Sequence, residues 1–259
     1  GLPGDAVAPD AVDAVRRLRA EHIPSAFAGT NAVTYVTGST AGTVDFFDLV
    51  NEYTPIVFGF VLALAFVLLA VVFRSIAIPI KSIILNLLSV GAAYGLMVLV
   101  TQEGIGASLF GFQQSAVVDA WIPLFLFTVL FGLSMDYHVF LLSRVRERFD
   151  QTGRSTESVA FGLRTTAGLI TGAALIMVAV FGGFASGSLV MFQQMGFGLA
   201  VAVLIDATIV RSVLVPAAMK LMGDWNWWFP SFLNWVPRVG IEGEPIHVPG
   251  EAVPAGASE

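Results

Sequence analysis

Five long runs of apolar residues dominate the pattern along this chain, and shorter, more polar connections separate them. A helix needs roughly 20 residues to cross the hydrocarbon core of a bilayer, and the runs are long enough for that. They are Pro55–Phe73, Ile78–Val100, Trp121–Ser143, Ala160–Phe184 and Met191–Leu221. The pattern therefore predicts a mainly α fold, a polytopic membrane protein with five transmembrane helices.

The composition agrees with a membrane protein. Apolar residues make up 56% of the chain and charged residues only 12%, whereas about 25% of a soluble domain is charged. The net charge of −6 argues against a nucleic-acid partner. Cysteine is absent, and the three histidines (His22, His138 and His247) are scattered, which argues against a metal site. No nucleophile–base pair or phosphate loop is present, so we expect neither an enzyme nor a cofactor.

Positive charges are unevenly distributed among the connections. The connection 74–81 carries two basic residues and the connection 144–159 carries four, whereas 101–120 and 185–190 contain no Lys or Arg. Connections rich in Lys and Arg remain in the cytoplasm. The first apolar run is therefore predicted to start outside the cell, and the C-terminus to lie inside it.

The flanking segments differ from the apolar runs. Residues 1–54, predicted to be outside, contain an amphipathic helical pattern over roughly Pro9–Glu21, and 40–53 can continue as a helix into the first run. This segment is too short to bury a core of its own, so we expect a larger protein with at least one earlier span. In the tail 223–259, an aromatic cluster typical of the membrane interface precedes a Gly/Pro/Glu-rich segment expected to be disordered.

The third apolar run contains Asp136, Tyr137 and His138 in its middle. An acid at this depth costs about 2.5–3.5 kcal/mol, so it needs a partner or a function. Asp136 is interpreted as a proton-carrying acid or as a structural interhelical hydrogen bond. Successive residues are rotated by about 100° in an α-helix, so the three side chains cannot face one point. For His138, packing or hydrogen bonding and an accessory proton site both remain open.

Other spans also carry polar residues. Asp206 and Arg211 lie about 140° apart around an α-helix, so we expect them not to pair. Arg211 would then extend toward the cytoplasm, and Asp206 would find a partner on another span. Asn86 is predicted to form a hydrogen bond between two helices. The pairs Gly91–Gly95 and Gly168–Gly172 predict close helix contacts.

Three segments resemble the MmpL branch of the resistance–nodulation–division (RND) superfamily. They are "VFRSIAIPIKSIILNLLSVGAAYG" (72–95), "FGLSMDYHVFLLSRVRERFD" (131–150) and "GFGLAVAVLIDATIVRSVLVPAAMKLMG" (196–223). The resemblance implies a bacterial plasma-membrane transporter of twelve spans in two similar halves, each half with a periplasmic porter domain. This chain would supply a small remnant of an α/β porter domain (1–54) and the last five spans of an RND-type bundle (55–222).

The resemblance also implies roles for individual residues. Asp136 and Tyr137 would be half of a proton relay, completed by an equivalent pair in the N-terminal half. Many relatives have Glu at the position of His138, which would then act as a titrating substitute or mark a different coupling detail. Asp206 and Arg211 would support coupling. The expected activity is export of lipids or hydrophobic small molecules driven by the proton-motive force, with protons, membrane lipids and the N-terminal half as partners.

Two alternatives from other classes remain open at this point. One is a lipid- or sterol-sensing membrane module that does not transport, and the other is a protein-export accessory of the SecD/SecF type. Asp136, Tyr137 and Asp206 favour a pump, because a passive sensor gains nothing from acids placed in lipid.

Overall fold

The computed structural model describes residues 8–115 and 118–230, and within these ranges it contains helices and no strand. Five helical stretches are long and apolar enough to cross a membrane, which confirms the predicted polytopic helical fold. Four are α3 (Ser39–Phe73), α4 (Ala77–Thr101), α6 (Trp121–Thr152) and α7 (Ser155–Ala185). The fifth is a continuous run of α8 (Val190–Ile205), the π-helical segment η2 (Asp206–Leu214) and α9 (Val215–Met222).

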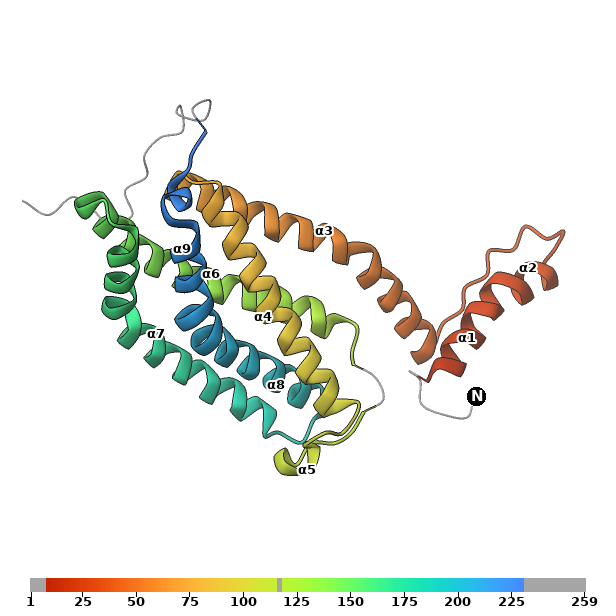
Figure 1. The fold of residues 1–259 in the computed structure, drawn as a ribbon. Coiled ribbons are helices and arrows are strands. Elements are labelled where there is room, and N and C mark those ends of the chain that lie inside the picture. Colours follow the sequence, from red (N-terminus) through yellow and green to blue (C-terminus); the bar gives the residue numbers. More distant parts are fainter. Residues whose placement is uncertain (1–7, 116–117, 231–259) are drawn as a thin grey trace, which may run out of the picture.

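The helices form a bundle in which α8 packs against α7 and α4, and α6 packs against α7 (Figure 1). The connections 74–76 and 153–154 lie at one end, together with the 3₁₀-helix η3 (Gly223–Trp227). We call this end, near most of the arginines, the basic end. The described parts of the next connection, 102–115 with α5 (Ala107–Phe110) and 118–120, lie at the opposite end together with the connection 186–189.

The boundary of α6 at the basic end has a local cause. Gly153 has φ = 65°, a left-handed conformation that costs glycine little because it lacks a Cβ atom. Its amide donates to the carbonyl of Phe149 at 2.8 Å, which caps the helix. The chain then turns and α7 begins at Ser155.

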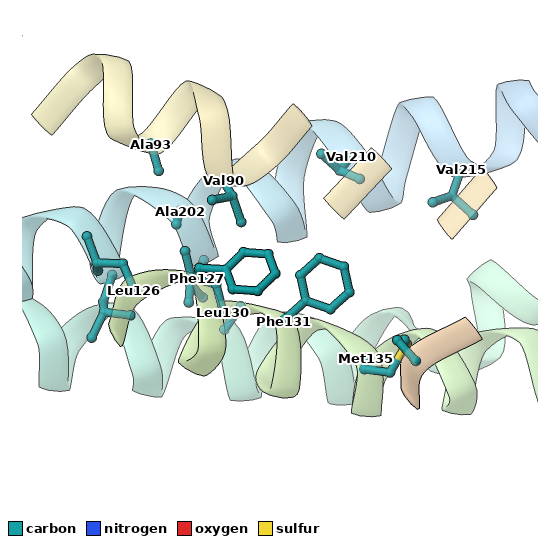
Figure 2. Close-up of a cluster of buried hydrophobic side chains, with 14 of the residues drawn as sticks. Val90, Ala93, Leu126, Phe127, Leu130, Phe131, Met135, Ala202, Val210 and Val215 are labelled. Carbon is teal, nitrogen blue, oxygen red and sulfur yellow. The ribbon is translucent and has the colours of Figure 1, made fainter. Parts of the chain in front are cut away.

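Apolar side chains from α6 fill the centre of the bundle. Figure 2 shows Phe127 and Phe131 of α6 turned toward Val90 of α4 and toward Ala202 in the last helical run. The ring of Phe127 also stacks on Phe58 of α3, with centroids 3.7 Å apart. These contacts hold α6 against α3, α4 and the last helical run. They therefore also position the polar residues that follow Phe131 in the sequence.

The close helix contacts predicted at the glycine pairs do not occur among the described residues. A Cβ atom placed on any glycine of the pairs Gly91–Gly95 and Gly168–Gly172 would have no neighbour within 4 Å, because these glycines lie on exposed helix faces. The close contacts occur instead at Gly162 and Gly196. A Cβ atom on Gly196 would lie 2.5 Å from the backbone nitrogen of Ala185, where α8 turns back against the end of α7.

The first described segment forms helices that lie beside the start of α3 (Figure 1). They are α1 (Pro9–Arg17), the π-helical η1 (Leu18–His22) and α2 (Ile23–Ala26). Val15 of α1 packs with Ala41 and Val44 of α3 in a small separate core. The predicted helix over 40–53 is indeed the start of α3, continuous with the first apolar run.

Ion pairs reinforce the contact between this segment and α3. Arg16 pairs with Asp48 at 3.0 Å, and Arg19 contacts Asp45 through both of its terminal nitrogens. The two acids, Asp45 and Asp48, lie in the polar first part of α3, before the apolar stretch begins at Pro55. The disorder expected after residue 230 falls outside the described residues.

Candidate functional site

A π-helical segment places two charged residues of the last helical run on one face. In a π-helix the hydrogen bonds join residues i and i+5, so residue i+5 lies about one turn beyond residue i. Within η2, Nη2 of Arg211 donates to Oδ2 of Asp206 at 2.9 Å. The expectation that these residues do not pair is therefore wrong, because it assumed α-helical spacing.

Arg211 points into the bundle instead of extending to the cytoplasm. Its side chain is 2% exposed, and it also donates to the carbonyl of Ser134 on α6 at 3.1 Å. The guanidinium carbon lies 5.0 Å from the centroid of the Tyr137 ring, within cation–π range. Arg211 thus joins η2 to two residues of α6, and the expectation that it extends out of the bundle is wrong for the same geometric reason.

Ser134 connects three helical elements at this depth. Its hydroxyl oxygen lies 2.8 Å from Oδ1 of Asn86 on α4 and 3.0 Å from Oδ2 of Asp206. A hydroxyl has one hydrogen and can donate to only one of these oxygens at a time. A protonated Asp206 would donate to Ser134 and leave the hydroxyl hydrogen for Asn86. The site therefore accommodates both the charged and the protonated carboxyl.

A small enclosed space lies beside this network. The cavity has a volume of about 20 Å³, and its polar lining comes from Asn86, Ser89, Ser134, Tyr137, Asp206 and Arg211. That volume is enough for one water molecule with several polar partners.

The Asp-Tyr-His triplet of α6 is divided among three environments. Asp136 is exposed at the surface of this bundle, one turn from the exposed residues Gly132 and Phe140. Tyr137 is half-buried, and its hydroxyl lies 3.4 Å from Sδ of Met177 on α7. His138 is completely buried. The structure thus brings Tyr137, Asp206, Arg211 and Asn86 together. Asp136 lies on the exposed face of α6, and His138 lies one turn beyond Ser134 without a hydrogen bond to this network in the described residues.

The sequence interpretation missed Ser134 and Ser82, both of which are buried. Each lies four residues from a polar residue that was singled out, Ser134 before His138 and Ser82 before Asn86. Residues four apart share a helix face, so this spacing was a usable signal. Within the described chain, neither ring nitrogen of His138 nor the hydroxyl of Ser82 has a hydrogen-bond partner.

Lys81 and Asn226 form a second buried polar contact, at the basic end. Nζ of Lys81 donates to Oδ1 of Asn226 at 3.2 Å, and both side chains are buried. The side-chain nitrogen Nδ2 of Asn226 donates to the carbonyls of Met219 and Gly223. The backbone carbonyl of Asn226 accepts a hydrogen bond from the hydroxyl of Ser75. Lys81 had been interpreted only as a charge of the connecting loop.

Comparison with known proteins gives consistent matches. The chain is 46% identical to the mycolic acid-containing lipids exporter MmpL11 of Mycolicibacterium smegmatis over 93% of its own length. It is 47% identical to the heme uptake protein MmpL11 of Mycobacterium tuberculosis over 76%, and 35% identical to the trehalose monomycolate exporter MmpL3 of M. smegmatis over 88%.

The chain spans between a fifth and a quarter of the length of these three relatives, with 25%, 20% and 21% of each protein covered. The model of the MMPL family matches residues 1–240, which is nearly the whole chain. With five helices able to cross a membrane, it is a multi-pass membrane protein. The chain belongs to the MMPL family, and so to the MmpL-type transporters of the RND superfamily.

Proposed function

We propose that this chain is the C-terminal part of a transporter that exports lipids or hydrophobic small molecules and is driven by the proton-motive force. Two of the relatives are described as lipid exporters, which supports the substrate class. The observation that carries the proton coupling is the contact of Arg211 with both Tyr137 and Asp206. It links the exposed Asp136–Tyr137 position to a buried ion pair.

Asp136 is the first proton site in this proposal. It lies on a face of α6 that Gly132 and Phe140 share and that the described helices leave uncovered. The N-terminal half of the transporter covers this face and completes the relay with Asp136 and Tyr137. Burial between the two halves removes water from this carboxyl, which then needs a partner or a function inside the membrane.

Arg211 couples the protonation of Asp206 to the packing of the helices. Protonation of Asp206 removes the charge that Arg211 pairs with, and the guanidinium then rests on the Tyr137 ring and the Ser134 carbonyl alone. Because these two contacts are on α6 and Asp206 is on η2, the change alters how α6 packs against the last helical run. His138 follows on the next turn and serves as an accessory proton site.

The proposal assigns the basic end of the bundle to the cytoplasm and residues 8–54 to the exported side, as the positive connections indicate. Protons then enter from the outside and leave at the basic end. A proton that crosses 100 mV releases about 2.3 kcal/mol. Concentrating a neutral substrate a thousandfold costs about 4.1 kcal/mol, so two protons per substrate suffice.

The test replaces Asp136 by Asn in the whole transporter, reconstituted in proteoliposomes with a proton gradient. We expect normal insertion and folding and loss of gradient-driven lipid transport, because an amide cannot carry the proton. Asp150→Asn is the matched control, since Asp150 is exposed on the same helix beyond the apolar run. Transport by Asp136→Asn at the normal rate would reject the proposal.

The name of the M. tuberculosis relative favours a second cargo, heme, and movement in the opposite direction. The same proteoliposomes distinguish the two cargoes when labelled lipid and heme are compared on each side of the membrane. Collapse of the proton gradient separates a pump from a sensing module or an export accessory. Movement of the lipid should stop when the gradient is collapsed, and a sensing module would show no movement in either condition.

A further inference from the structure

Buried polar residues continue from the Asp206 network toward the basic end. α4 and α6 run in opposite directions, and Ser134 of α6 contacts Asn86 of α4. Ser82 precedes Asn86 by four residues, and His138 follows Ser134 by four. Both steps are about one helical turn toward the basic end, so His138 and Ser82 occupy the same level of the bundle.

This level carries unsatisfied hydrogen-bonding groups. His138 and Ser82 are both fully buried, and the two ring nitrogens and the hydroxyl have no partner in the described ranges. A buried polar group without a partner costs about 1–3 kcal/mol, and native proteins rarely leave one without a reason. An apolar residue at either position would avoid this cost, so the two residues are explained best by something that binds there.

Two buried cations lie near the level of His138. Arg211 of η2 contacts the carbonyl of Ser134, one turn before His138, and Lys81 of α4 is adjacent in sequence to Ser82. Asp206, the partner of Arg211, lies one turn away beside Ser134, and Asp136 lies on the exposed face of α6. Beyond His138, the next turn toward the basic end is apolar and buried, with Ile78 of α4 and Leu142 of α6. The side chain of Lys81 reaches past this layer to Asn226.

We propose that His138 and Ser82 bind the proton on its way to the cytoplasm, and that the contact between Lys81 and Asn226 closes this exit route. The proposal rests on the proposed function, which brings a proton to Asp206. His138 accepts that proton on one ring nitrogen and releases a proton from the other, and so returns to its neutral form. Ser82 accepts one hydrogen bond and donates another, which suits it to the same step.

The cations give the exit a gate. Protonation of His138 adds a third positive charge near Arg211 and Lys81, and like charges repel strongly where water is scarce. Lys81 is the flexible one of the two cations, because its ammonium is held by a single neutral acceptor, Asn226. Repulsion moves this ammonium toward the cytoplasm and breaks that contact. Water then reaches the level of His138 and takes up the proton.

The test compares His138→Gln, which keeps hydrogen bonding but cannot carry a proton, with His138→Glu, which can. Both are made in the whole transporter in proteoliposomes. We expect His138→Gln to slow gradient-driven transport by about a hundredfold, at the lower end of what a positioned proton-transfer group contributes. His138→Glu should restore most of the driven rate, which a purely structural role of the histidine would not predict.

A second variant tests the exit route without changing His138, where a substitution can disturb folding. Ser82→Ala removes a hydroxyl that has no partner, so it should not destabilise the fold. We expect it to slow driven transport severalfold and to flatten the dependence of the rate on pH at the basic end. Ser212→Ala is the matched control, because Ser212 is exposed on η2.

The outcomes separate the two proposals. If His138→Gln and Ser82→Ala pump at the normal rate while Asp136→Asn does not, the exit route is wrong and the proposed function stands. Equal loss in His138→Gln and His138→Glu would also overturn the exit route. If Asp136→Asn pumps normally, the proposed function itself is rejected.

Discussion

Arg211 donates a hydrogen bond of 2.9 Å to Asp206, five residues earlier in the same helical run. An α-helix would hold the two side chains on different faces, and the π-helical segment η2 brings them together. The pair therefore depends on a local change of helix geometry. Its neighbours on α6, Ser134 and Tyr137, connect it to the span that carries Asp136.

Removing one partner of this pair should be costly. Arg211→Met leaves the Asp206 carboxylate buried without its cation, and breaking a buried pair in this way costs about 3–5 kcal/mol of the free energy of unfolding. The measurement is denaturant-induced unfolding of the purified transporter.

The double variant that combines Arg211→Met with Asp206→Asn provides the control for this prediction. It should recover most of the lost stability, since no unpaired charge remains. If the two single costs simply add, the residues do not form a pair in the folded protein.

Gly196 should tolerate no side chain. A Cβ atom there would lie 2.5 Å from two backbone atoms of α7, so Gly196→Ala must shift α8 away from α7. Overpacking of this kind costs about 1–3 kcal/mol. Gly172→Ala is the control, because its Cβ atom would have no neighbour within 4 Å. Thermal unfolding should show a lower Tm for Gly196→Ala alone, and equal effects of the two variants would contradict the packing described here.

Asn226 should stabilise the basic end of the bundle. Asn226→Ala removes the acceptor of Lys81 and the donor to the carbonyls of Met219 and Gly223. A hydrogen bond to a charged group contributes about 1.5–3 kcal/mol, so we expect a loss of at least that size. Asp224→Ala, at an exposed position in the same 3₁₀-helix, should change the stability by less than about 0.5 kcal/mol. A neutral effect of Asn226→Ala would show that Lys81 does not depend on this contact.

The contact of η1 with α3 should weaken in acid. The hydrogen bond from Arg19 holds the pKa of the Asp45 carboxyl below its usual value. A lowered pKa means that the stabilisation is fully present above the unfolded value of about 3.9 and is lost as the pH falls through the lower, folded value. Amide exchange in η1 should therefore accelerate in that range. Asp45→Asn should exchange faster at neutral pH and lose this dependence, and an unchanged profile in that variant would exclude Asp45 as the cause.

Much of this protein follows from the sequence alone. Five apolar runs and the small number of charges predict the spans, because lipid accepts only helices whose backbone groups are paired internally. The helix that joins 40–53 to the first span, and the conspicuous acids Asp136 and Asp206, can also be found without coordinates. The role of Asp136 stays a prediction, since the part of the transporter expected to cover it lies outside this chain.

The pairing of side chains required the tertiary structure. The sequence carries no plain sign that η2 is π-helical, so the Asp206–Arg211 pair was placed on opposite faces by α-helical spacing. The glycines that allow close contact depend on which faces of α7 and α8 meet, and periodicity does not specify that. Lys81 looks like a loop charge until the fold brings Asn226, 145 residues later, to its ammonium. Contacts between distant segments are decided by packing, and local pattern does not encode them.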